Sequence, residues 1–275
     1  MTISVNSNTG ALVALQNLNA TNRQLETVQN RISTGLKVAN AKDNGGAFAI
    51  AQKLRADVRS LDVVQQSLSR VGSLVDVASA AGQAISDLLV DLKEKALAAT
   101  DTSLDATSRT ALNEDFKALR DQIKTIVNNA NFNGSNLINN STNSVAALAN
   151  ASGSAAITIL DEALQLSGSI VTVTTTEQIN TITKAKAALT AVNASLTNVN
   201  GALARLGTKS KAIEIQSKFI VKLSDALTAS IGSLVDADLA KESAKLQSLQ
   251  VKQQLGVQAL SIANKAPQTI LGFFR

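Results

Sequence analysis

The sequence lacks most of the side chains on which enzymes and metal sites depend. Its 275 residues include no histidine, cysteine, tryptophan or tyrosine, and only one proline and one methionine. Without histidine and cysteine, a histidine-based triad, a thiol nucleophile or a zinc site of the usual ligands cannot be built. Carboxylate and lysine chemistry stay open in principle, but we expect no enzyme, no cofactor and no metal. The absence of cysteine fits both the cytosol and the exterior of the cell.

The charge balance and the apolar runs argue against nucleic acids and membranes as partners. The net charge is +5 and the pI is near 9.5, but the lysines and arginines are dispersed and no tyrosine or tryptophan offers a stacking surface. No run reaches the roughly 18 apolar residues of a membrane span, so we expect none. The first 22 residues carry no charge and so lack the basic start of a cleaved secretory signal.

Both ends of the chain carry a helical pattern with a narrow apolar stripe. The pattern predicts one helix over about residues 8 to 34, with polar caps before it and Gly35 after it, and a second over 233–275 that ends in an apolar tail after Pro267. A lone helix cannot bury such a stripe, so we expect the two helices to pair. The stripe residues are Leu12, Leu15, Leu18, Leu25 and Ile32 at one end, and Leu246, Leu249, Leu260, Phe273 and Phe274 at the other.

Between the ends, the pattern predicts long helices with a single non-helical interruption. A glycine-rich connector at 35–46 precedes helices over 47–131, where a seven-residue apolar repeat is broken only at Asp57 and Gly82. At 132–176 alternating residues predict one or two β-hairpins, around Ile157 and Val171, and a helix over 177–232 then returns. The predicted packing residues of these helices are Leu54, Leu61, Leu68, Leu196, Leu203 and Leu206.

These elements predict a mainly α fold. We expect a long antiparallel helical bundle or coiled coil with both termini paired and a small β-hairpin region at mid-chain. On pattern alone, an ordinary bundle with no role in assembly is the alternative, because most heptad positions are simply core.

Several short motifs at both ends of the chain resemble bacterial flagellin, the subunit of the flagellar filament. They occur in the family's order over about residues 1–134 and 180–275. They are Arg31 to Lys37 (RISTGLK) followed by Ala41-Lys42-Asp43, then Phe132-Asn133-Gly134, and finally Asp236-Ala237-Asp238, Ala263-Asn264 and Pro267-Gln268 before Arg275. Only about 45 residues separate the two halves, so the chain resembles a near-minimal flagellin without large surface domains.

The resemblance implies a subunit that polymerises into the helical filament for swimming motility. It implies that the stripe residues of the terminal helices form an inner layer, that the middle helices form an outer layer, and that other flagellin copies are the main partners. It also implies an extracellular location reached through the flagellar export channel without a cleaved signal peptide. A flagellar export chaperone, the export apparatus, and hook-filament junction and cap proteins are the further partners implied. The alternatives are a hook-filament junction protein or another self-assembling coiled-coil scaffold.

Two loops have a second interpretation each. The stretch from Lys37 to Asp43 has lysines, with glycines on either side of it, before a helix, as phosphate-binding loops do, but it lacks their spacing, and a connector is favoured. The stretch from Ser141 to Thr176 is rich in serine and threonine, so it is either a site of O-glycosylation, as the resemblance implies, or a set of plain polar loops.

Overall fold

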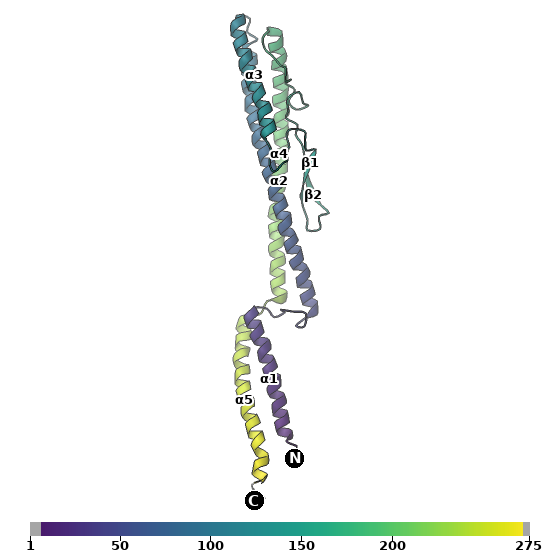
Figure 1. Ribbon diagram of the computed structural model, residues 1–275, viewed down its shortest axis with the longest axis vertical. Helices are drawn as coiled ribbons and strands as arrows, with labels where there is room; N and C mark the ends of the chain where they lie inside the picture. Colours follow the sequence, from purple (N-terminus) through teal and green to yellow (C-terminus); the bar gives the residue numbers. More distant parts are fainter. Residues whose placement is uncertain (1–6, 272–275) are drawn as a thin grey trace. The chain divides into compact units, whose positions relative to one another are not determined.

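The computed structural model describes the backbone of residues 7–271 and the side chains of residues 7–265, and the chain divides into two compact units. Unit 1 combines Met1–Ala56 with Ala226–Arg275, and unit 2 comprises Asp57–Asp225. The fold is mainly α with one small antiparallel sheet, which confirms the predicted class (Figure 1). The elements are α1 (Thr9–Thr34), α2 (Gly45–Ala98), α3 (Ala106–Asn129), β1 (Ser144–Leu148), β2 (Ala156–Leu160), α4 (Ile182–Val235) and α5 (Leu239–Leu271).

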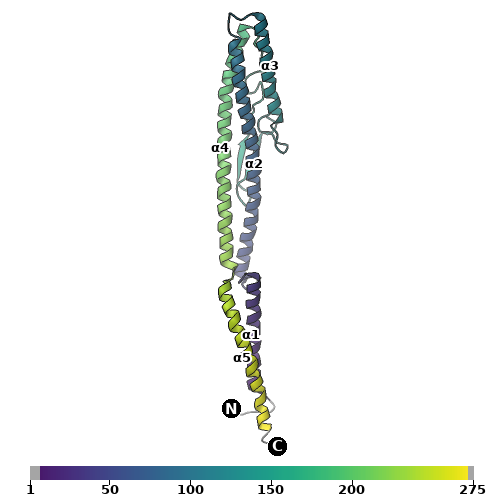
Figure 2. The same cartoon turned by 90° about the vertical axis from the view of Figure 1, so that its left-hand side faces the viewer.

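In unit 1, α1 and α5 lie side by side and antiparallel (Figures 1 and 2). Helix α1 begins after Asn8, whose side-chain oxygen accepts a hydrogen bond from the backbone N–H of Ala11. It ends at Gly35, whose φ of 72° is the left-handed conformation predicted for a glycine cap. The polar start and glycine stop therefore set the length of the helix.

The connector after α1 is bonded to the segment that joins α4 to α5. The backbone N–H of Lys37 donates to the carbonyl of Val235 at 2.8 Å, and the N–H of Ala237 donates to the carbonyl of Gly35 at 2.8 Å. Val38 and Val235 are buried together beneath these bonds. Both connections between the long and the terminal helices thus share one small apolar core.

The hydrogen bonds within the connector argue against a phosphate-binding loop. The carboxylate of Asp43 accepts hydrogen bonds from the backbone N–H groups of Ala39 and Asn40, at 3.0 and 3.1 Å. The amides that a phosphate would use are therefore already bound to an anion of the chain itself. Asn44 then caps α2 by accepting from the N–H of Ala47.

In unit 2, α2 and α4 run antiparallel, and the seven-residue repeat of α2 supplies the core between them. Gln65 donates to Ser217 at 2.6 Å, and Ser86 lies 3.5 Å from Asn200. Residues later in α2 therefore contact residues earlier in α4, as antiparallel helices do. At Gly82 an added Cβ would lie 2.8 Å from a methyl group of Leu203. The break in the repeat is therefore a notch that accepts a leucine from α4.

Helix α2 also meets the length and composition test for a membrane span, alone among the helices in the described part of the chain. The core helix of a soluble protein passes the same test, and 33% of the apolar window is buried inside the structure. The apolar repeat that packs against α4 accounts for this composition.

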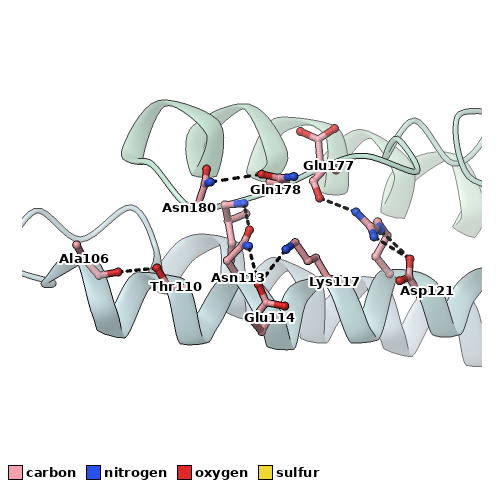
Figure 3. Close-up of polar contacts among 11 residues, drawn as sticks. Ala106, Thr110, Asn113, Glu114, Lys117, Asp121, Glu177, Gln178 and Asn180 are labelled. Carbon is pink, nitrogen blue, oxygen red and sulfur yellow. Dashed lines mark hydrogen bonds and ion pairs between the residues drawn. The ribbon is translucent and has the colours of Figure 1, made fainter.

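Helix α3 packs against the segment of unit 2 that leads into α4 (Figure 3). The side-chain oxygen of Asn113 accepts from the backbone N–H of Ile179 at 2.8 Å, and the guanidinium of Arg120 donates to the carbonyl of Glu177 at 2.8 Å. Phe116 lies between them in sequence and is fully buried. Polar contacts from two turns of α3 thus flank its main apolar contact.

The mid-chain region contains one β-hairpin among the described residues. Strands β1 and β2 pair antiparallel from Ser144 opposite Leu160 to Leu148 opposite Ala156. The second alternation, at Val171 and Val173, forms no strand although both side chains are buried. The carbonyls of Val171 and Val173 accept from the N–H groups of Gly168 and Ser167, at 3.0 and 2.9 Å, but the N–H of Thr172 between them donates to the Ser195 hydroxyl of α4 at 2.9 Å. Of the one or two hairpins that the sequence predicts, the described residues form one.

Candidate assembly interface

The pair formed by α1 and α5 is fixed in register by polar contacts along its length. Besides capping α1, Asn8 donates from its side-chain nitrogen to the carbonyl of Ala263 at 2.7 Å. Farther along, Gln253 donates to the side chain of Asn22 at 2.8 Å. Arg31 forms an ion pair with Glu242 at 3.2 Å near the connector. A shift of one helix along the other would break all three contacts.

Apolar contacts between the two helices follow the predicted stripes. Leu249 and Val28 are buried, and Gly256 lets Leu18 approach so closely that an added Cβ would lie 3.2 Å from its methyl group. Leu25, Ile32, Leu246 and Leu260 are half-buried. The structure therefore places these predicted residues in the seam between α1 and α5.

Other predicted residues of the terminal helices do not lie in this seam. Leu12 and Leu15 are 63% and 42% exposed on α1. Phe273 and Phe274 lie outside the described residues. In a single chain, pairing of α1 with α5 therefore leaves part of the predicted stripe exposed.

Three apolar residues missed by the sequence reasoning lie on the far side of α5. At about 100° per residue, Val251, Leu255 and Ile262 point about 200–240° around the axis from Leu249. They are 55%, 62% and 66% exposed. We call these three residues the outer stripe. A helix that is apolar on opposite faces is typical of one buried on both sides, and this was the signal available in the sequence.

The predicted packing residues of the long helices lie mostly inside the chain. Leu61 and Leu68 of α2 and Leu206 of α4 are buried in the core of unit 2. The remaining three, Leu54, Leu196 and Leu203, are half-buried. The first three therefore serve the folding of one subunit, because no surface is left on them for another.

Charged groups also have structural partners in the described residues. The side chain of Glu242 is only 8% exposed, and it pairs with Arg31 at 3.2 Å and with Lys245 at 3.8 Å. In unit 2, hydrogen bonds and charge from Lys211 and Lys218 lower the pKa of Glu214 to about 2, on an exposed face of α4. Within residues 7–265, no three potential metal ligands of the histidine, cysteine or carboxylate type come together.

Comparisons with known proteins agree along nearly the whole chain. The family models described as the N-terminal and C-terminal helical regions of bacterial flagellin match residues 5–143 and 189–274. Flagellin FljK of Caulobacter vibrioides is 50% identical, over 99% of this chain and 98% of its own length. A flagellin of Brucella melitensis is 37% identical over 99% of both chains. A crystal structure of Bacillus cereus flagellin, 20% identical, superposes with a TM-score of 0.50 over 56% of this chain and 88% of its own.

Proposed function

Because the chain belongs to the bacterial flagellin family, and is thus a structural subunit of the extracellular flagellar filament and not an enzyme, we propose that α1 and α5 join its copies. The family implies self-polymerisation, so the question is which surface is used. The observation that carries the proposal is the outer stripe, exposed on the face of α5 turned away from α1.

Burial of the outer stripe against another copy would supply binding energy for assembly. Each large aliphatic side chain contributes about 1.5–3 kcal/mol when it passes from water to an apolar contact. A contiguous exposed apolar surface usually marks an interaction site. When one face of a subunit binds a different face of the next, the contact repeats without closing and generates an open helix.

We assign layers to the chain on the same basis. The inner layer comprises 1–34 and 233–275, with Leu12, Leu15, Phe273 and Phe274 among its assembly residues. The outer layer comprises 47–131 and 177–232, linked by the connector 35–46 and carrying the hairpin and loops of 132–176. The outward apolar residues of α1 and α5 support the inner assignment, and the buried residues of α2 and α4 support a self-contained outer body.

Family membership also supports a set of partners and a route. We propose that the subunit leaves the cell through the flagellar export apparatus without a cleaved signal peptide, escorted by an export chaperone. Hook-filament junction and cap proteins then lie at the two ends of the polymer. Because α5 carries apolar residues on opposite faces, it needs cover before assembly, and a chaperone bound there would provide it.

Removal of residues 268–275 tests the role of the chain end. The deletion is expected to abolish filament formation, because Ile270, Leu271, Phe273 and Phe274 supply apolar surface to the inner layer. Electron microscopy after salt-induced polymerisation gives the readout, with circular dichroism to show that the helices of unit 2 remain. The double variant Phe273→Leu/Phe274→Leu keeps the tail apolar and should still form long helical filaments. Normal filaments from the truncated chain would refute the assignment.

A further inference from the structure

A basic groove follows one flank of the α1–α5 pair, beside the outer stripe on α5. Its volume is about 380 Å³, Val28 and Leu249 line it, and Arg31, Lys245 and Lys252 bring three cations to it. The α5 residues recur at helical spacing, so the two lysines lie on one face of that helix, about 10 Å apart along the axis.

Among the described side chains, one carboxylate pairs with the cations of this groove. Glu242 lies at its end, where it pairs with Arg31 at 3.2 Å and more distantly with Lys245 at 3.8 Å. The ammonium group of Lys252 forms no hydrogen bond or ion pair with any residue from 7 to 265. The groove therefore keeps an excess of positive charge over a partly apolar floor, which favours a carboxylate as its occupant.

Helices α1 and α5 offer one acidic side chain that is free to fill the groove. The two helices contain two acidic side chains, Glu26 and Glu242, while Asp236 and Asp238 precede α5 in the segment that joins it to α4. Glu242 is buried and already paired, whereas Glu26 is exposed and its carboxylate forms no hydrogen bond or ion pair in the described part of the chain. Glu26 is therefore the unpaired acid that matches the unpaired Lys252.

Glu26 cannot reach the groove of its own chain. At about 100° per residue, its side chain points about 160° around α1 from Gln24 and Val28, which line the groove. The acid and the groove thus lie on opposite flanks of one helix pair. A contact between them needs two copies, and it uses different faces of each.

We propose that Glu26 of one copy enters the basic groove of the next copy and pairs there with Lys252 and Lys245. Such a contact is heterologous, so it repeats from copy to copy without closing. It rests on the proposed joining of copies through α1 and α5, and it adds what an apolar stripe lacks, a fixed stagger between neighbours. Charge pairs of this kind set register and partner choice more than affinity.

Charge reversal of either partner tests the pair. Glu26→Lys and Lys252→Glu are each expected to raise the critical concentration for polymerisation about tenfold, because each variant loses an attraction and gains a like-charge contact. Both sites are exposed, and monomer circular dichroism should not change. Lys241→Glu is the matched control, an exposed cation of α5 outside the groove, and it should polymerise as the unmodified chain does.

Mixing supplies the decisive readout. The two reversed chains are each defective alone, but an equimolar mixture should polymerise near the original critical concentration. The reason is that the introduced lysine of one chain faces the introduced glutamate of the other, and the two unaltered partners also meet. The chain carrying both reversals should recover as well. If neither single reversal changes polymerisation, or if the mixture and the double variant stay defective, the pairing is wrong. Polymerisation unaltered by charge reversal, together with loss of filaments on deleting 268–275, would refute this pair and leave the joining role of α1 and α5 standing.

Discussion

Replacement of Leu255 and Ile262 together by glutamine is expected to raise the critical concentration for filament formation at least about thirtyfold. Both side chains lie in the outer stripe, 62% and 66% exposed in the single chain. Full burial is worth about 1.5–3 kcal/mol for each side chain, so if a neighbouring copy buries the exposed two thirds, the two substitutions forfeit about 2–4 kcal/mol. A tenfold change corresponds to about 1.4 kcal/mol, so about thirtyfold is the lower bound. Sedimentation of polymer at graded subunit concentrations measures it.

The folded monomer should be unaffected by this double variant. Glutamine forms helices about as well as leucine, and both side chains are mostly exposed in the single chain, so helical content and thermal unfolding of the monomer should match the original. Ser243→Gln/Ser261→Gln is the control, since it adds two glutamines at exposed positions of α5 outside the stripe. Equal critical concentrations for the stripe and control variants would show that the outer stripe faces solvent in the filament.

Phe116→Ala is expected to lower the free energy of unfolding of unit 2 by about 3–5 kcal/mol. The ring is fully buried between α3 and the rest of unit 2, and its removal costs both the transfer of an aromatic side chain and a cavity. The polar contacts of Asn113 and Arg120 on either side hold α3 in place, so the cavity cannot easily collapse.

The chain provides a matched control for this loss. Phe219→Ala makes the same chemical change at a site on α4 that is 54% exposed, and it should cost less than about 1 kcal/mol in the monomer. Urea unfolding of the monomers, followed by circular dichroism, compares the two variants directly. Similar midpoints for both would mean that Phe116 is not the core residue of α3 that the structure describes.

The sequence predicted the helices well because their ends carry strong local signals. Asn8 begins α1 by side-chain capping, and Gly35 ends it by a left-handed backbone. Neither signal needs information from the rest of the fold. The repeat in α2 likewise predicted its buried face. The interruption at Gly82 became intelligible only in the structure, because the leucine that fills it, Leu203, comes from a distant segment.

The sequence left the number of hairpins open because distant contacts decide it. Val171 and Val173 alternate like a strand, but Ser195 of α4 binds the backbone between them, and no local pattern encodes that bond. The outer stripe was missed for a different reason. A search for one apolar face per helix finds Leu249 and Leu260 and overlooks the outer stripe on the opposite face. Apolar side chains on two faces indicate a helix that is buried on both sides.

The central claim, that copies join through the α1–α5 pair, can be tested by thiol labelling, since the chain has no cysteine of its own. Leu255→Cys places a single thiol in the outer stripe, and Leu15→Cys places one on α1. The labelling rate of each is measured in monomers and in filaments. We expect Leu255→Cys to react at least about a hundredfold more slowly in filaments, and Leu15→Cys to be protected too. Equal rates in monomer and filament at both positions would contradict the claim.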